Sequence, residues 1–199
     1  MCIRDRVHPG DYVIFDTTYQ KLANQRLTSR ALDDKLGAFI CLEALKKAKE
    51  YKTKNGVYAL TSVGEETTMR GSTFAGYMVH PTLALVVDVT FVTGTAEGVG
   101  CGDVQLGKGP VLCHSSIVNK KLNSMLEKVA KEYNIPIQYE IAVGSTGTDA
   151  DRLYYTKEGI PCALISIPLK NMHSPSEICD LRDVEAIIEL IARFICKLE

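Results

Sequence analysis

Leu83-Ala84-Leu85-Val86-Val87-Asp88-Val89 is the stretch that decides the fold, an apolar run with one carboxylate near its end. A short run without polar alternation predicts a β-strand covered on both faces. Because an unpaired carboxylate inside such a strand would be costly, Asp88 is expected at the strand end beside a cation, a hydrogen-bond partner or water. Two interpretations stay open here: Asp88 belongs to a metal or active site, or it is a plain strand-end acid.

Strand-like and helix-like segments alternate on both sides of this run. Apolar residues at helical spacing predict helices over residues 36–48, 122–133 and 184–195, the last with Asp183 as its N-cap. Strands are predicted over residues 7–15, with a turn at 9–11, and over residues 56–63, 137–143 and 160–167. The glycine-rich residues 94–109 predict a loop. Such alternation is typical of an α/β fold with a mixed sheet between helical layers.

Composition excludes several classes of function. The formal net charge of -1 argues against a nucleic-acid-binding or membrane-seeking basic surface. No apolar stretch has the length of a membrane span, and the N-terminus lacks the apolar core of a signal peptide. The seven scattered cysteines contain no C-x-x-C pair and are expected to be small buried side chains in a reducing compartment. A cytoplasmic protein is therefore predicted, and residues 1–6, which fit no pattern, are expected to be a non-native lead.

Three further groups of polar side chains lie where predicted apolar segments begin or end. Asp33-Asp34 precedes a predicted helix, Glu65-Glu66 follows a predicted strand, and His173 follows another. Each group has an ordinary alternative, namely a helix N-cap, a solvated acid pair and a structural hydrogen-bonding histidine. Taken in order with Asp88, these carboxylates and one imidazole suit a hard or borderline divalent metal at the edge of an α/β sheet.

A polar turn, Ser145-Thr146-Gly147-Thr148-Asp149-Ala150, adds one more candidate. Asp149 either caps a following helix or lines a substrate pocket. The chain contains neither G-x-S-x-G nor a phosphate-binding glycine loop, so serine-histidine-aspartate catalysis and nucleotide binding lack support. Paired glutamates after a strand instead suit metal-assisted hydrolysis, in which one acid binds metal and the other takes a proton from water.

Several motifs, in their order and approximate spacing, resemble those of one known family. They are Ser29-Arg30-Ala31-Leu32-Asp33-Asp34-Lys35-Leu36-Gly37, Glu65-Glu66 with Arg70-Gly71-Ser72, Leu106-Gly107-Lys108-Gly109-Pro110, Gly147-Thr148-Asp149-Ala150 and Met172-His173-Ser174-Pro175. The family is that of the glutamyl/tetrahedral aminopeptidases, metallopeptidase family 42, some of whose members were once labelled endoglucanases. The resemblance extends from about residue 7 to the C-terminus.

This resemblance implies a zinc-exopeptidase-like α/β/α sandwich with a mixed central sheet, interrupted by a smaller inserted β domain that helps subunits associate. Residues 7–28 would be a remnant of the inserted domain. Residues 29–199 would be the peptidase catalytic domain without its N-terminal segment. For the full-length enzyme, the resemblance implies peptide substrates and a homo-oligomer.

The resemblance also implies roles for individual side chains. Asp33 would bridge two divalent metal ions, zinc or cobalt. Glu66 and His173 would complete one metal site, and Asp88 would belong to the other. Glu65 would be the general base that activates the bridging water.

Asp34 would support the site by orienting the backbone, and the Asp33-Asp34 peptide bond would be cis, as in similar enzymes. The family has a further histidine ligand before the inserted domain, which nothing in this chain matches, so one of the two metal sites is expected to be incomplete. Gly64 stands where many relatives have a polar residue, and Lys170-Asn171 where an arginine and an aromatic residue are common, which leaves the preferred substrate open.

The expected function is therefore that of a dinuclear metalloaminopeptidase. One alternative is a catalytically silent fragment that binds one metal or serves subunit association. Another is a related hydrolase that acts on a different amide or on a glycan, the latter through a carboxylate pair without metal.

Overall fold

The central sheet is mixed and has four strands in the order β3-β6-β4-β5. β3 (Ala84–Phe91) is parallel to β6 (Cys162–Leu169), β4 (Val111–Ser115) is antiparallel to β6, and β5 (Gln138–Ala142) is parallel to β4. The run at residues 83–89 forms most of β3, as predicted. The structure, a computed structural model, describes residues 6–94 and 102–198; Cys2, Cys101 and most of the expected lead at 1–6 lie outside this part.

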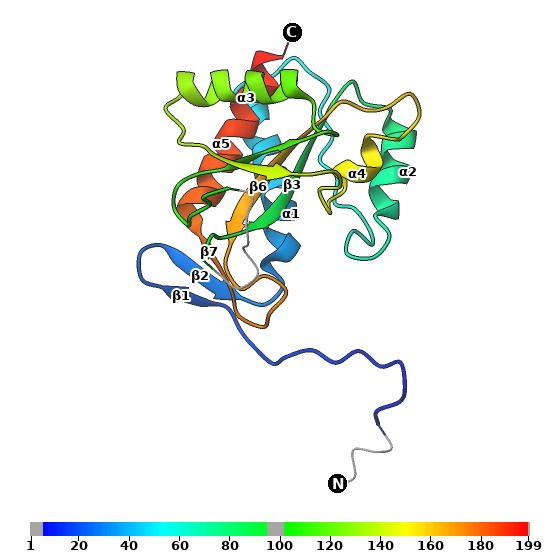
Figure 1. The fold of residues 1–199 in the computed structure, drawn as a ribbon, viewed down its shortest axis with the longest axis vertical. Coiled ribbons are helices and arrows are strands. Elements are labelled where there is room, and N and C mark those ends of the chain that lie inside the picture. The colour runs from blue at the N-terminus through cyan, green and yellow to red at the C-terminus, as the bar shows by residue number, and fades with distance from the viewer. Residues whose placement is uncertain (1–5, 95–101, 199) are drawn as a thin grey trace.

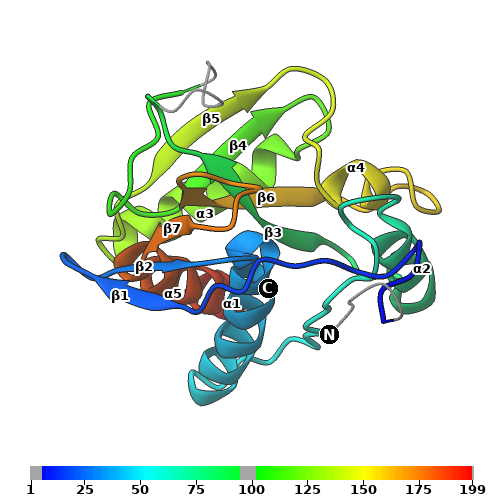
Figure 2. The ribbon, with the colours of Figure 1, turned by 90° about the horizontal axis from the view of Figure 1, so that it is seen from below.

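Helices cover both faces of the sheet (Figure 1 and Figure 2). They are α1 (Leu32–Glu50), α2 (Arg70–Val79), α3 (Lys120–Glu132), α4 (Ala150–Leu153) and α5 (Leu181–Lys197). On one face, Ile165 and Ile167 of β6 share a core with α1, α3 and α5. On the other face, Cys162 and Leu164 pack against α4, which in turn contacts α2. The predicted α/β/α sandwich is confirmed.

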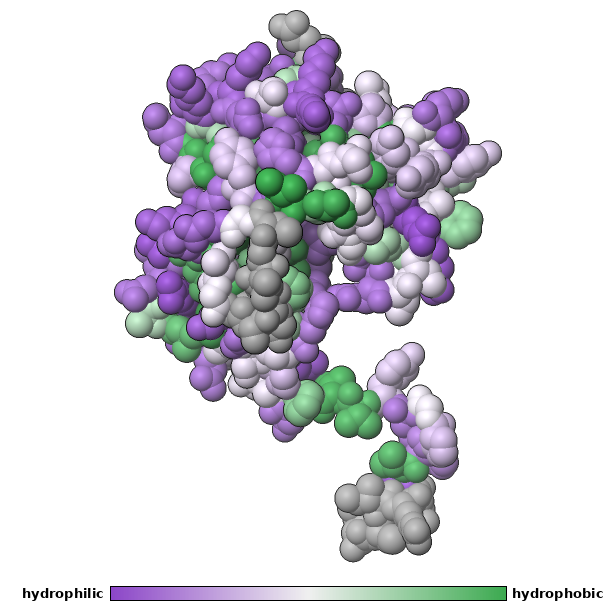
Figure 3. Space-filling view, viewed as in Figure 1, coloured by the Kyte–Doolittle hydropathy of each residue, from purple (hydrophilic) through white to green (hydrophobic). Residues whose placement is uncertain are grey.

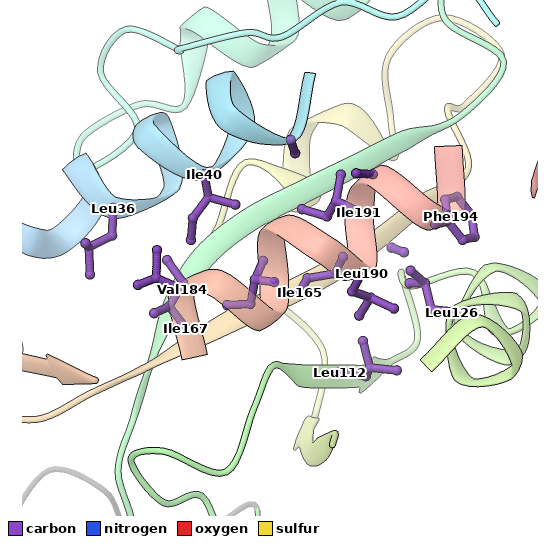
Figure 4. Close-up of a cluster of buried hydrophobic side chains, with 14 of the residues drawn as sticks. Leu36, Ile40, Leu112, Leu126, Ile165, Ile167, Val184, Leu190, Ile191 and Phe194 are labelled. Carbon is purple, nitrogen blue, oxygen red and sulfur yellow. The ribbon is translucent and has the colours of Figure 1, made fainter. Parts of the chain in front are cut away.

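The larger core lies between α1, α5 and the sheet (Figure 4). Leu36, Ile40, Ala44 and Ala48 are buried and recur at every fourth residue, so they line one side of α1. They face the buried side of α5, on which Ile191 lies. Because this packing holds α1 against β3 and α5, it also sets the position of the first turn of α1, where Asp33 and Asp34 lie.

A second sheet joins segments that are far apart in the sequence. It is antiparallel, in the order β1 (Gln20–Leu22), β2 (Arg26–Ser29) and β7 (Glu177–Asp180). Ser29 of β2 pairs with Glu177 of β7, so the start of α1 lies beside the turn between β6 and β7. β1 and β2 are short, and neither is buried. Their sequences therefore carry no apolar alternation that would predict a strand.

Two predicted strands are wrong. Residues 7–15 form no strand but an arm that leaves the body of the molecule and carries apolar side chains (Figure 1 and Figure 3), among them Tyr12 and Val13, which are 100% and 88% exposed. Residues 56–63 also form no strand; they lie across a groove from β3, whose only paired neighbour in the described part of the chain is β6. Apolar alternation indicates a strand only when a partner can receive its backbone hydrogen bonds.

The start of α5 also differs from the prediction. The N-cap is Asp180, whose side chain accepts a hydrogen bond from the amide of Arg182. Asp183 lies inside the helix and is buried, and its carboxylate accepts hydrogen bonds from the amides of Gly107 and Gly109, both at 2.7 Å. Asp183, which local spacing suggested as the N-cap, therefore binds the backbone of a distant loop instead of capping the helix.

The remaining predicted helices and strands are present within a few residues, although α2, β4 and the second sheet were not predicted. Residues 95–101 of the predicted glycine-rich loop lie outside the described residues. Of the described cysteines, Cys113, Cys162 and Cys179 are buried and Cys41 and Cys196 half-buried. Among residues 6–94 and 102–198, no helix combines the length and apolar character that crossing a membrane requires.

Asp180 provides a test of the α5 start. Its carboxylate also accepts hydrogen bonds from the Arg182 guanidinium, at 2.8 Å from Nε and 2.6 Å from Nη2, and lies 3.7 Å from Arg26 Nε. Asp180→Ala removes the cap and should lower the free energy of unfolding by about 1–2 kcal/mol, whereas Asp180→Asn keeps a capping oxygen and should cost less. Urea denaturation measures both values, and equal losses in the two variants would contradict a capping role.

The same residue predicts a pH dependence. Hydrogen bonding from Arg182, opposed by burial, lowers the pKa of Asp180 in the folded state. A lowered carboxyl pKa contributes stability above its ordinary value of about 3.9, and this contribution is lost as the pH falls through the folded pKa. The difference in unfolding free energy between the wild type and Asp180→Asn should therefore be constant near neutral pH and shrink below about pH 4.

Candidate metal centre

The first part of the candidate centre is the start of α1. Asp33 and Asp34 have non-helical backbone angles and a cis peptide bond between them, as the resemblance implied. Asp34 acts as a capping residue, because its carboxylate accepts a hydrogen bond at 2.8 Å from the amide of Gly37, three residues further on. A Cβ at position 37 would collide with the Asp34 carboxylate, so glycine is needed there. Asp33 takes no part in capping.

The second part is the turn that precedes α2. The carbonyl of Gly64 accepts hydrogen bonds from the amides of Thr68 and Met69, at 2.9 and 2.7 Å. Gly64 has a φ of 73°, a conformation that glycine adopts without steric cost. The tight turn that results holds Glu65 and Glu66 outside strand geometry, so that both acids can face one site.

The third part is His173, in the turn between β6 and β7. Its Nε2 lies 3.0 Å from Asp33 Oδ2 and 3.8 Å from Glu66 Oε2. One candidate ligand atom from each of these three side chains lies within 4.8 Å of the other two. The Asp33 side chain is 6% exposed, whereas those of His173 and Glu66 are 63% and 58% exposed, so the cluster is open to solvent on one side.

Glu66 of this triad also lines a groove, together with four further carboxylates. Asp34, Glu65, Glu66, Asp88 and Asp149 all line a groove of about 920 Å³ that runs between β3 and residues 55–62. Burial, and then the charge of Asp88, raises the pKa of Asp34 to about 9. Burial also raises the pKa of Asp88 to about 8, although the Val89 amide donates a hydrogen bond to it. Burial and mutual repulsion therefore disfavour the charged forms of the carboxyl groups at the wall of the groove.

The same repulsion acts on Asp33 and Glu65. Burial, and then the charge of Glu66, raises the pKa of Asp33 to about 6. Burial, and then the charges of Asp149 and Glu66, raises the pKa of Glu65 to about 7. Each acid thus holds its proton more tightly than an isolated carboxyl group does.

The residues present fit a divalent cation. Within residues 6–94 and 102–198, no lysine or arginine forms an ion pair with any of these acids, and His173 is the one basic partner. Glu65 Oε1 and Asp149 Oδ1 are buried, and neither has a hydrogen-bond partner among the described residues. Carboxylate oxygens with one imidazole are the ligands that zinc and similar ions bind. A cation at the triad would offset the repulsion between the acids and displace their protons.

Asp88 and Asp149 lie near the triad but outside it. No third histidine, cysteine or acid in the described part of the chain completes a group of three ligands with Asp88. Asp149 stands at the start of α4 but makes no side-chain capping bond. Instead it accepts a hydrogen bond from the hydroxyl of Ser62 and lines the groove. Asp149 therefore occupies the N-cap position of α4, but its side chain does not cap the helix.

Glu177 and Ser62 also belong to the surroundings of the site, although no motif in the sequence indicates them. Glu177 is 2% exposed, and its carboxylate accepts hydrogen bonds from the backbone amides of Leu32, Asp33 and His173. Neither residue belongs to a pattern in its own segment. A lone glutamate between Ser176 and Ile178 gives no sign of burial, because two of the three amides that bind it, those of Leu32 and Asp33, come from a distant part of the chain.

Comparison with known proteins agrees with the resemblance. The family model of the M42 glutamyl aminopeptidases matches residues 3–190. A lysyl aminopeptidase of Pyrococcus furiosus is 35% identical over 176 residues, which cover 88% of this chain and 50% of the relative. The chain spans about half the length of the curated relatives it matches.

Solved structures give the same result. The aminopeptidase APDkam598 of the archaeon Desulfurococcus kamchatkensis superposes with a TM-score of 0.81 at 31% identity, over 93% of this chain and 53% of that one. The TET1 peptidase of Pyrococcus horikoshii, which can assemble into a tetrahedron or a large octahedral shell, has a TM-score of 0.82 at 27% identity, over 98% of this chain and 57% of that one. The expected fold is confirmed.

Metal titration tests the triad. We expect calorimetry with Zn²⁺ or Co²⁺ to show one tight ion per chain, because Asp33, Glu66 and His173 supply three ligands and Asp88 lacks a comparable set. His173→Ala should weaken binding by more than about tenfold. His8→Ala, which removes an exposed imidazole from the arm, is the matched control and should bind as the wild type does. Two equivalent tight sites, or unchanged affinity in His173→Ala, would refute this assignment.

Proposed function

Because this chain belongs to the M42 glutamyl aminopeptidase family, we propose that the protein is a metal-dependent aminopeptidase that hydrolyses N-terminal residues from peptides. The observation that carries the proposal is the triad of Asp33, Glu66 and His173, which stands beside Glu65 at a groove. A ligand set next to a carboxylate with one oxygen left without a hydrogen-bond partner by the described residues suits metal-assisted hydrolysis.

In this proposal Asp33, Glu66 and His173 hold one divalent ion, zinc or cobalt. Asp33 and Asp88 would bind a second ion more weakly. Asp34, which accepts a hydrogen bond from the Gly37 amide, supports the backbone beside Asp33. Such ions lower the pKa of a bound water and polarise the scissile carbonyl. The protein's own part is to orient the peptide and to move the proton.

Glu65 is the proposed general base. Glu65 lines the groove, and its Oε1 has no hydrogen-bond partner among the described residues, so its carboxylate is available to accept a hydrogen bond from a water molecule there. Its pKa is raised to about 7, by burial first and then by Asp149 and Glu66, and a catalytic pKa near the working pH is the most effective for proton transfer. This carboxylate would take the proton from the attacking water and return it to the leaving amine.

Asp149 is suited to the end of the substrate that an aminopeptidase must bind. The amino terminus of a peptide is positively charged at neutral pH. Asp149 lines the groove, and one of its oxygens has no hydrogen-bond partner among the described residues. We propose that Asp149 belongs to the substrate pocket and attracts this amino group, with Ser62 orienting its carboxylate.

Assembly and location are proposed on separate grounds. The exposed apolar side chains of the arm and the β1–β2 hairpin suit a surface that associates with another subunit, so we assign residues 7–28 to an inserted association domain and residues 29–199 to the catalytic domain. The TET1 peptidase, a structural relative, forms large shells, which supports a homo-oligomer. The free thiols of Cys41, Cys162 and Cys179 suit a reducing cytoplasm.

Glu65→Gln tests the proposed mechanism. The amide cannot accept a proton, so hydrolysis of aminoacyl anilides by the protein loaded with Zn²⁺ or Co²⁺ should fall by at least about 100-fold. Metal stoichiometry, measured in parallel by calorimetry, should not change, since the three ligands of the triad remain. Glu43→Gln, on the surface of α1 beside Lys46, is the control and should keep wild-type turnover.

Three results would change the interpretation of that experiment. Unchanged turnover in Glu65→Gln would exclude Glu65 as the base. Metal binding by the wild type without hydrolysis would favour a silent metal-binding or association module. Activity that survives complete removal of metal by a chelator would favour a hydrolase that works through a carboxylate pair.

A further inference from the structure

Glu177 connects two segments that carry candidate metal ligands. Its Oε2 accepts hydrogen bonds from the amides of Leu32 and Asp33, at 2.6 and 3.2 Å. Its Oε1 accepts one from the amide of His173, at 2.9 Å. One carboxylate therefore joins the start of α1 to the turn between β6 and β7, although these segments lie about 140 positions apart in the sequence.

This arrangement is unusual for a buried acid. Glu177 is 2% exposed, and among the described residues no lysine, arginine or histidine side chain pairs with it. A buried charge is costly unless hydrogen bonds replace its hydration, and bonds from backbone amides to a carboxylate are of the strong, charge-assisted kind. The bonds that compensate Glu177 come entirely from the backbone of the candidate ligand segments.

Those backbones need an external support. Asp33 has non-helical angles within the first turn of α1, and His173 has a φ of 60°, which is uncommon for a residue with a side chain. Such conformations persist only where the surrounding structure holds them. Glu177 contacts the amides of both residues and leaves their side chains free to face each other at 3.0 Å.

We propose that Glu177 is the positioning residue of the metal centre, a buried carboxylate that fixes the separation of Asp33 and His173 so that both can bind the same cation. The inference rests on the proposed metal site and deepens it. It also predicts that a glutamate is needed at this position. A glutamine has one acceptor oxygen and would turn its NH₂ group toward one of the two sets of amides, and an aspartate is shorter by one methylene.

The test compares Glu177→Gln with a matched variant. Asp183 is also a buried acid that accepts backbone amides, from Gly107 and Gly109, but it contacts neither segment of the metal centre. Asp183→Asn therefore reports the effect of losing a buried carboxylate on the fold alone. Both variants are titrated with Zn²⁺ by calorimetry and with Co²⁺ by visible absorption, and circular dichroism monitors their folding.

We expect Glu177→Gln to weaken metal binding by about 10- to 100-fold and to alter the Co²⁺ absorption bands, because the ligands lose their spacing. Asp183→Asn should be less stable than the wild type but should keep wild-type metal affinity and the same Co²⁺ spectrum. Wild-type affinity and spectrum in Glu177→Gln would overturn the proposal. An equal loss of affinity in Asp183→Asn would also overturn it, since the loss would then reflect general destabilisation.

If Glu177→Gln does not fold, Glu177→Asp decides the question. This variant keeps the charge but reaches only one of the two segments, so it should fold and bind metal more weakly than the wild type; equal affinity would overturn the proposal. The outcome is separate from that of the proposed function. Tight metal binding without peptide hydrolysis by the wild type would end the aminopeptidase proposal and leave the role of Glu177 intact, whereas a wild type that binds no metal would end both.

Discussion

β3 and β6 pair in parallel over their whole length, from Ala84 opposite Cys162 to Phe91 opposite Leu169, and the rest of the molecule is arranged around this pair. Because β6 is buried on both faces, helices must cover both sides of the sheet. Because the two strands run in the same direction, both deliver the chain to the same edge. Asp88 near the end of β3 and His173 in the turn after β6 therefore lie at one site.

The acids at this edge of the sheet lower the stability of the metal-free fold, but they supply the oxygen atoms of the candidate metal site. Asp34 and Asp88 are buried in a region where their pKa values rise to about 9 and about 8, chiefly through burial. At the position of Asp88, an apolar side chain would serve a purely structural role better. A cation that the acids share would offset their repulsion, so the cost in the metal-free protein is itself a sign of binding function.

The three candidate ligands are supported in two different ways. Glu177 ties the backbone of Asp33 to that of His173, and β2 and β7 pair directly beside it. Glu66 stands in a separate turn, closed by hydrogen bonds to the carbonyl of Gly64. Two ligands thus share one rigid support, and the third approaches from a turn that is held independently and is more exposed to solvent.

The sequence by itself determined the features that depend on local pattern. The apolar runs of β3 and β6 and the stripes of α3 and α5 predicted the layered α/β fold, since burial of one face follows directly from residue spacing. Motif order predicted the family and named Asp33, Glu66 and His173 as a set. The tertiary structure alone decided which segments pair and which acids come together. Residues 56–63 have the alternation of a strand and no paired neighbour. Asp183 accepts hydrogen bonds from a distant loop instead of capping its helix, and Glu177 accepts hydrogen bonds from the amides of Leu32 and Asp33, about 145 positions away. Such contacts depend on how the chain folds back on itself, which no local pattern records.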